Sequence, residues 1–299
     1  MAKVWSLWSA FWFSPVQLRK TSLFRVAAAS IMLVYFAIRH TELPDFYYDT
    51  GMLSLEKARR LFDGVYHTPL FWFPVDPVMV QALHGLLLLL LLLLALGVWP
   101  RLMAAGALYL HVLFEHRNFL VMYGFDKVAA AWLFYLMLMR SDSHFSPRAS
   151  RQFKSSDLLT PAAVRMAQIH LCVIYAYSGL EKFRGNSWWS GEALWSIVAN
   201  GIVSPFDLSF VAHAPWLIYL GTYSTLLWEA YFPLAIWIPY LRRPWLVFGV
   251  VFHVMTAVMM NLVFFASIMI AGYLLFWDEP EQEAEPERAG TGHRFKLRV

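Results

Sequence analysis

Repeated apolar stretches, most of them long enough to cross a lipid bilayer, are the feature that most limits what this chain can fold into. A helix of about 20 apolar residues spans the roughly 30 Å hydrocarbon core of a bilayer. We find eight candidate segments, of which the third and the eighth are short: residues 23–40, 78–98, 101–115, 122–140, 161–182, 215–238, 244–262 and 263–277. Because lipid offers backbone groups no hydrogen-bond partners, the sequence predicts an all-α, polytopic transmembrane helical bundle of about eight spans.

The composition supports a membrane location and excludes other classes. Hydrophobic residues make up 59% of the chain and charged residues 15%, whereas soluble domains carry about a quarter charged residues. The 14 Trp and 14 Tyr suit the two membrane interfaces. The basic residues are scattered over loops and tails, so we expect the lipid bilayer as a partner and no nucleic acid. The one cysteine, Cys172, excludes an intramolecular disulfide and a thiolate metal site.

The distribution of Lys and Arg predicts the orientation in the membrane. Basic residues near helix ends favour the cytoplasm. With eight spans, five groups of basic residues fall on one side: those within residues 3–25, Arg101, those within residues 140–154, Arg242 with Arg243, and those within residues 288–298. The other side receives the acidic loop 41–77 and the loop 184–214. We therefore expect a multi-pass cell-membrane protein with both termini in the cytoplasm.

Three regions follow from these patterns. Residues 1–22 form a predicted cytoplasmic N-terminal segment, which does not match a cleaved signal peptide because no clean apolar core ends in small residues. Residues 23–277 form the transmembrane domain, in which residues 192–200 could form a short interfacial helix. Residues 278–299 are charged and rich in Pro and Gly, so we expect a disordered cytoplasmic tail.

Three sequence blocks point to a known family. They are YAYSGLEKF at 175–183 with WWSG at 188–191, EAYFPL at 229–234 with FHVM at 252–255, and HRN at 116–118 leading to YGFD at 123–126. The first block resembles the membrane part of vitamin K-dependent gamma-carboxylases and of the bacterial HTTM-domain proteins related to them. The second block is similar to that family's run in the same order, and the third block is a weaker match. The resemblance covers residues from about 20 to 277.

The resemblance implies a chemistry for the lysine of the first block. Lys182 matches the base that deprotonates vitamin K hydroquinone, so a reduced quinone is the implied cofactor and carboxylation of a peptide glutamate, a lyase activity, the implied reaction. Burial of an ammonium group penalises its charge, which suits a lysine that must act as a neutral amine. The remaining implied site residues would line or polarise the pocket, or pack on an aromatic ligand: Glu229, His253 and Asp126, and Tyr177, Trp188 and Trp189.

Each of these residues also has a structural interpretation. A lysine at a helix end commonly extends its amine to the membrane interface, here helped by Glu181 and Arg184. Glu229 and His253 lie inside predicted spans, where a polar group is costly unless it faces a cavity or a partner. We therefore expect both to face the bundle interior, either as functional groups or as hydrogen-bonded structural groups.

Two further polar sites have simple interpretations. Asp126 could form an ion pair with Lys127 at a helix end. His111 and His116 are five residues apart and do not share a helix face, so they are poor joint ligands. The sequence also contains no HExxH motif, and we predict no metal site.

The chain departs from the carboxylases at three points. Glu181 stands where they have a second lysine, and Asp126 where they have a histidine. The large lumenal domain that holds their glutamyl substrate is not expected within these 299 residues. These departures bear on carboxylation rather than on the fold.

Three function classes therefore remain open at this point. The first is a carboxylase-like enzyme whose outward-facing pocket binds a quinol-like ligand and modifies a peptide. The second is a non-enzymatic accessory protein, resembling the small HTTM proteins that assist maturation or export of a secreted peptide toxin. The third is a transporter, which fits less well because no pair of broken, repeated helices is visible. A co-purified quinone would support the enzyme, and an obligate peptide partner without a quinone would support the accessory protein.

The predicted orientation can be tested by cysteine labelling on intact cells. Cysteines introduced as Asp49→Cys and Asn186→Cys should react with a membrane-impermeant thiol reagent, because both lie in predicted outer loops. A cysteine introduced as Ser150→Cys should stay unlabelled until the membrane is opened. Labelling of Ser150→Cys from outside would contradict the eight-span arrangement.

Overall fold

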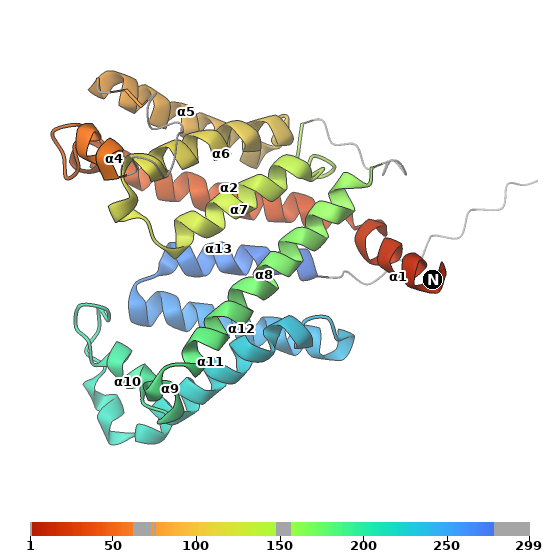
Figure 1. The fold of residues 1–299 in the computed structure, drawn as a ribbon, viewed down its shortest axis with the longest axis vertical. Coiled ribbons are helices and arrows are strands. Elements are labelled where there is room, and N and C mark those ends of the chain that lie inside the picture. The colour runs from red at the N-terminus through yellow and green to blue at the C-terminus, as the bar shows by residue number, and fades with distance from the viewer. Residues whose placement is uncertain (1, 62–72, 75, 148–156, 278–299) are drawn as a thin grey trace, which may run out of the picture.

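The described part of the chain is entirely helical. In this computed structural model, residues 2–61, 73–74, 76–147 and 157–277 are described, and within these ranges all regular structure is α or 3-10 helix (Figure 1). The all-α bundle is therefore confirmed. The predicted disorder of residues 278–299 and the labelling position Ser150 lie outside the described residues.

Every predicted apolar segment contains a helix. These helices are α2 (Leu18–Arg39), α5 (Pro77–Leu96), α6 (Pro100–Arg117), α7 (Gly124–Leu138), α8 (Leu159–Phe183), α11 (Pro215–Ala235), α12 (Pro239–Met260) and α13 (Val263–Tyr273). Of the described helices, four are long and apolar enough to cross a membrane: Leu18–Phe46, which continues α2, and α5, α8 and α12. The chain is thus built with helices suited to a membrane, and eight crossings stay a prediction.

Short elements connect the long helices. They are α1 (Ala2–Phe13), η1 (His40–Glu42), α3 (Leu43–Phe46), α4 (Leu55–Leu61), η3 (Phe119–Val121), α9 (Asn186–Trp189), α10 (Ala193–Val198), η4 (Ser209–His213) and η5 (Leu274–Phe276). The short helix predicted over 192–200 is confirmed by α10. Helix α1, within the predicted N-terminal segment 1–22, was not predicted.

The ends of α5 show how local sequence sets the helix boundaries. The Asp76 side chain accepts hydrogen bonds from the backbone N–H groups of Val78 and Met79, at 2.8 and 3.0 Å, and so caps the first turn. Gly97 ends the helix at φ +78°, a left-handed conformation that glycine adopts without steric cost. Pro100 then begins α6 at a position where no backbone N–H is needed.

Helix α13 joins two parts of the bundle. It packs against α12 on one side and against α2 and α7 on the other, and Figure 1 shows it lying between these helices. The indole N–H of Trp132 in α7 donates to the Ile268 carbonyl of α13 at 3.0 Å. A side chain at Gly272 would meet Trp132 at 2.7 Å, so the glycine permits this close packing.

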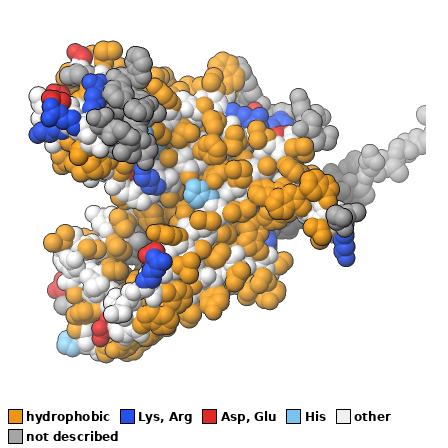
Figure 2. Space-filling view, viewed as in Figure 1, with side chains coloured by type: hydrophobic (Ala, Val, Ile, Leu, Met, Phe, Trp, Pro, Cys, Tyr) orange, Lys and Arg blue, Asp and Glu red, His pale blue; other side chains and the backbone are white. Residues whose placement is uncertain are grey.

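The two ends of the bundle carry different elements. Helices α4, α9 and α10 lie at one end, and α1 lies at the other (Figure 1). On the face drawn in Figure 2, the charged side chains gather toward these ends and the surface between them is mostly hydrophobic. The loops that were predicted to share the outer side, 41–77 and 184–214, thus contribute their described helices to the same end.

At the α1 end of the bundle, a buried arginine of α2 forms hydrogen bonds with the end of α5 and with the connection after α7. Arg25 of α2 is fully buried, and its guanidinium donates to carbonyls at the end of α5 and in the connection after α7: Leu94 at 2.7 Å, Ala95, Ser141 at 2.9 Å, His144 at 3.2 Å and Phe145 at 2.7 Å. Guanidinium carries five N–H donors in a fixed planar arrangement, which matches a set of converging carbonyls. One side chain therefore binds backbone carbonyls of two segments that are distant in sequence, in addition to the bond that Leu94 accepts from the Gly97 N–H at 3.0 Å.

This arrangement predicts that Arg25→Lys destabilises the protein despite keeping the charge. An ammonium has three donors, so at least two of the five carbonyls lose their bond, at about 1–3 kcal/mol for each buried group left unsatisfied. Thermal unfolding in detergent should show a lowered midpoint for Arg25→Lys and little change for the exposed Arg19→Lys on the same helix. Equal midpoints for the two variants would show that the carbonyls are satisfied in another way.

Candidate functional site

A close contact between α8 and α11 positions the residues of the first and second sequence blocks. A Cβ atom on Gly179 would lie 2.9 Å from the backbone N and 3.0 Å from the Cα of Ala230. Real Cβ atoms are not found this close to backbone, so the two helices approach this closely because residue 179 is glycine. The approach brings the last turn of α8 beside Glu229.

Lys182 and Glu229 form an ion pair across this contact. Lys182 Nζ lies 2.6 Å from Glu229 Oε2 and donates to Ser178 Oγ at 2.7 Å. The side chain of Glu229 is 5% exposed and that of Lys182 is 20% exposed. The amine also lies 5.2 Å from the centroid of the Trp188 ring, a cation–π distance. The lysine amine is thus surrounded by a carboxylate, a hydroxyl and an aromatic face.

His253 belongs to a second polar cluster, centred on Tyr175. The Tyr175 hydroxyl lies 2.6 Å from His253 Nε2 and 2.6 Å from the Tyr273 hydroxyl. Within the described structure, His253 Nδ1 is buried and has no hydrogen-bond partner. Because Glu229 and His253 are both buried, the prediction that they face the bundle interior is confirmed.

Aromatic packing connects the two clusters. The Tyr175 ring lies 4.8 Å from Trp228 and 4.3 Å from Phe232, centroid to centroid, and these two residues flank Glu229 on α11. Tyr175 and Tyr273 were not predicted as site residues. Tyr175 opens the YAYSGLEKF block, but nothing in the sequence indicated that α12 and α13 would pack against it.

Asp126, the acidic residue of the third block, does not lie with Lys182 and Glu229. Asp126 sits in the first turn of α7, where its carboxylate accepts from the Tyr123 backbone N–H at 3.0 Å, and His111 Nε2 lies 3.0 Å from its carbonyl. The ion pair predicted between Asp126 and Lys127 is wrong, because Lys127 Nζ points to Glu115 Oε1 at 3.4 Å. In the described ranges no interaction joins Asp126 to the lysine site, so its role there is not supported.

The charged neighbours of Lys182 on its own helix end do not bind it. Arg184 Nη1 lies 2.7 Å from Glu181 Oε1, at the surface. The predicted support of Lys182 by Glu181 and Arg184 is therefore wrong: these two pair with each other, and Lys182 pairs with Glu229 instead.

The three predicted aromatic residues are not equivalent. Trp188 contacts the Lys182 amine, as described above. Trp189 is 59% exposed, and its indole N–H donates to the Phe183 carbonyl at 2.7 Å. Tyr177 is 66% exposed and precedes Lys182 by five residues, which places it about 140° away around α8. Tyr177 and Lys182 therefore cannot hold one ligand between them.

The end of the molecule that carries α4, α9 and α10 is hollowed. Figure 2 shows a depression between the part that contains α4 and the part that contains α9 and α10. The contact between Lys182 and Trp188, at the junction of α8 and α9, lies toward that end. The lysine site thus lies at the end of the molecule that carries this depression.

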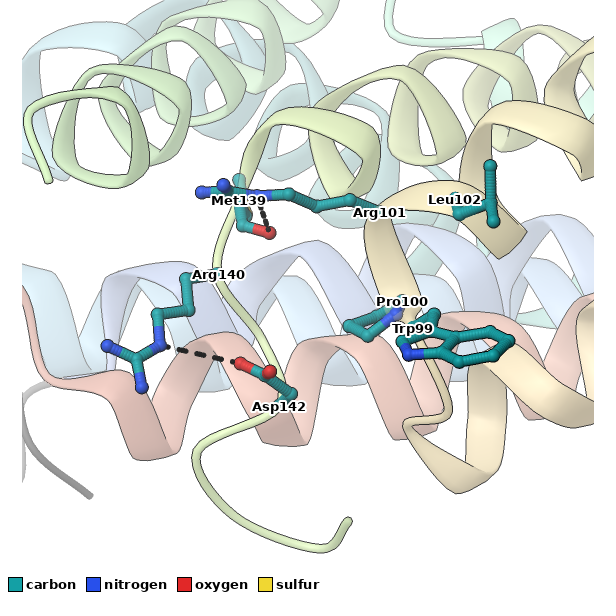
Figure 3. Close-up of a pocket in the computed structure, with 7 residues that line it drawn as sticks. All are labelled: Trp99, Pro100, Arg101, Leu102, Met139, Arg140 and Asp142. Atoms are coloured by element: carbon teal, nitrogen blue, oxygen red, sulfur yellow. Dashed lines mark hydrogen bonds and ion pairs between the residues drawn. The ribbon is translucent and has the colours of Figure 1, made fainter. Parts of the chain in front are cut away.

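A pocket of about 540 Å³ lies at the opposite end, where α6 begins and α7 ends. Figure 3 shows Trp99, Arg101, Arg140 and Asp142 in its wall, with the Arg140 guanidinium directed at the Asp142 carboxylate. Arg140 Nε lies 3.5 Å from Asp142 Oδ1, and Arg101 Nη2 lies 3.8 Å from Asp157 Oδ1. The arginines of this pocket are thus paired with carboxylates, and the pocket is remote from Lys182.

Comparisons with known proteins do not assign this chain to a family. No protein-family model, curated protein or solved structure matches the chain. In the described ranges no three His, Cys, Asp or Glu side chains are grouped so that they could hold a metal ion. The candidate site is therefore defined by its own geometry: Lys182, Glu229, Ser178 and Trp188, with the Tyr175 cluster behind them.

A double-mutant cycle tests how much the interaction between Lys182 and Glu229 contributes to the stability of the protein. Lys182→Leu leaves the carboxylate of Glu229 buried without a cation, which should cost about 2 kcal/mol of unfolding free energy. That is less than the 3–5 kcal/mol of fully buried pairs, because Lys182 is partly exposed. The double variant Lys182→Leu, Glu229→Leu should be more stable than Lys182→Leu alone. Purely additive losses in detergent unfolding would show that the two groups do not interact.

Proposed function

We propose that this chain is a membrane protein of the HTTM type whose Lys182 acts as a general base on an apolar, quinol-like ligand bound at the outer end of α8. The single observation that carries the proposal is the contact between the Lys182 amine and a buried carboxylate, Glu229, beside the face of Trp188. The residues of this contact lie in, or directly follow, the two sequence blocks that carry the family resemblance.

The residues around the amine suit a planar ligand with an acidic hydroxyl. Trp188 offers a face for stacking, and Lys182 offers the basic nitrogen. A reduced quinone would supply the acidic phenolic hydroxyl and the reducing equivalents for a reaction with oxygen. Trp189, which is exposed next to this site, can contribute further aromatic surface, and Tyr177 is left out of the proposed pocket because it lies on another face of α8.

Glu229 holds the amine of Lys182 beside the proposed ligand. Its carboxylate lies 2.6 Å from Nζ, and the amine also lies near the face of Trp188. In the proposed reaction the neutral amine accepts the proton of a ligand hydroxyl brought within hydrogen-bond distance. The quinol becomes its anion, and the ammonium that forms pairs with the Glu229 carboxylate.

The second candidate function is the accessory protein for maturation or export of a secreted peptide. One observation favours it: the Lys182 amine already has two hydrogen-bond partners and an aromatic face, as expected of a side chain that joins helices. In that case a peptide partner would bind the outer loops, and the polar residues would hold α8, α11, α12 and α13 together.

Lys182→Arg separates the two candidates. The substitution keeps the positive charge and the pairing with Glu229, but a guanidinium stays protonated and cannot act as a base. We expect normal expression and a rate of vitamin K hydroquinone oxidation reduced by about two to four orders of magnitude, the range for loss of a general base. The measurement is quinol consumption by the purified protein under oxygen, with Arg184→Lys as the control.

Two outcomes would reject the enzymatic proposal. One is quinol oxidation by Lys182→Arg at the rate of the unmodified protein. The other is the absence of quinol binding together with retention of a peptide partner by Lys182→Arg and its loss by Lys182→Leu, which is the pattern expected of the accessory protein.

A further inference from the structure

Helix α1 is attached to the bundle by its C-terminal half. The Phe11 carbonyl accepts a hydrogen bond from Arg165 Nε of α8 at 2.9 Å, and the Arg165 guanidinium lies 5.2 Å from the centroid of the Phe11 ring. The Phe11 ring also lies 5.7 Å from that of Trp237, in the turn between α11 and α12. These contacts hold α1 at the end of the bundle opposite α9 and α10 (Figure 1).

The N-terminal half of α1 exposes large apolar side chains. Val4, Trp5, Leu7 and Trp8 are 72, 71, 63 and 55% exposed. Val4, Leu7 and Trp8, together with Phe11, recur at the i, i+3, i+4 and i+7 positions of one helix face. A contiguous exposed apolar face of this kind marks a surface that contacts another molecule or a membrane.

The other side of α1 is polar and carries one positive charge. Ser6 and Ser9 lie opposite the apolar face, since successive residues are rotated by about 100°. Lys3 is the one charged residue of the helix, and residues 1–41 contain no Asp or Glu. Trp on the apolar face and Lys beside it are typical of helices that lie in the plane of a membrane interface.

The position of α1 favours lipid over a protein as the occupant of its apolar face. Helix α12, which begins beside Trp237, is the least buried of the four long apolar helices, with 17% of its apolar stretch buried inside the bundle. Figure 2 shows hydrophobic side chains over α1 that continue onto the hydrophobic surface of the bundle. An indole ring carries one polar N–H on an apolar body, which suits the headgroup region of a bilayer. The distribution of Lys and Arg predicts that this end is cytoplasmic, where anionic lipids attract Lys3.

We propose that α1 is an interfacial helix, which lies in the headgroup region of the leaflet at this end of the bundle. Val4, Trp5, Leu7 and Trp8 enter the upper part of the acyl chains, and Ser6 faces water. The partner of this surface is the lipid bilayer itself. Because Phe11 is bonded to Arg165 near the start of α8, the depth of α1 also sets the depth of that end of α8.

The test measures the depth of α1 in the full chain, reconstituted in liposomes of phosphatidylcholine and phosphatidylglycerol. Spin labels are attached at Trp8→Cys or at Ser6→Cys, in a Cys172→Ser background. Electron paramagnetic resonance compares their collisions with oxygen, which concentrates among acyl chains, and with a water-soluble nickel chelate. We expect the label at position 8 about 5–10 Å below the phosphates, the usual depth of an interfacial apolar face. The label at position 6 is the matched control and should lie at the level of water.

A second measurement asks whether the apolar side chains cause this depth. Trp5→Ser combined with Trp8→Ser removes two indoles from the apolar face, so a label at Leu7→Cys should move toward water. Ser9→Ala, on the polar side of the helix, should leave the depth of that label unchanged. A label at position 7 that stays at the same depth in the double variant would show that protein contacts alone place α1, which would contradict the proposal.

Three results at position 8 would also overturn the proposal. Collisions mainly with the nickel chelate would place the apolar face in water. Few collisions with either reagent would mean that another part of the protein covers it. Spin–spin broadening that disappears on dilution with unlabelled protein would identify a second copy of the chain as the occupant.

Discussion

Lipid offers no hydrogen-bond partners, and this constraint determines where the polar side chains of the bundle lie. Polar groups on helices that face apolar surroundings must bind one another or a backbone carbonyl. Trp132 meets this requirement through the Ile268 carbonyl, and Gln168 through the Leu275 carbonyl at 2.7 Å. Arg25 meets it through several carbonyls at once. Each of these bonds joins segments distant in sequence, so satisfying the polar groups also fixes the arrangement of the helices.

Glycine residues determine where helices can pack closely enough to bring these polar side chains together. Glycine lets helix backbones approach closely inside a membrane, and Gly179 does so between α8 and α11. At Gly249 of α12, a Cβ atom would lie 2.6 Å from both Trp228 and the Tyr273 hydroxyl. The amine–carboxylate pair and the tyrosine–histidine cluster therefore lie where glycines bring α8 close to α11 and bring α12 close to Trp228 and Tyr273.

The helices were predictable from the sequence because hydrophobic length and turn residues are local signals. The partners of the polar residues were not. Lys182 was expected to interact with charges on its own helix end, yet it binds Glu229, which lies 47 residues further along. That pairing depends on the rotation of α11 against α8, which Gly179 sets and which no periodicity reports. Asp126 shows the same limit: its place in a sequence block did not indicate that α7 would direct it to another cluster.

The burial of Glu229 has a consequence for how the chain enters the membrane during synthesis. Helix α11 has 21 residues, yet it is not among the four described helices that are apolar enough to span a bilayer by themselves. An acidic residue in a helix entering the bilayer alone raises the cost of insertion by a few kcal/mol. Helix α8 is made first and carries the matching cation. In the predicted eight-span arrangement, the entry of α11 is therefore assisted by α8, which is synthesised earlier and is already in place.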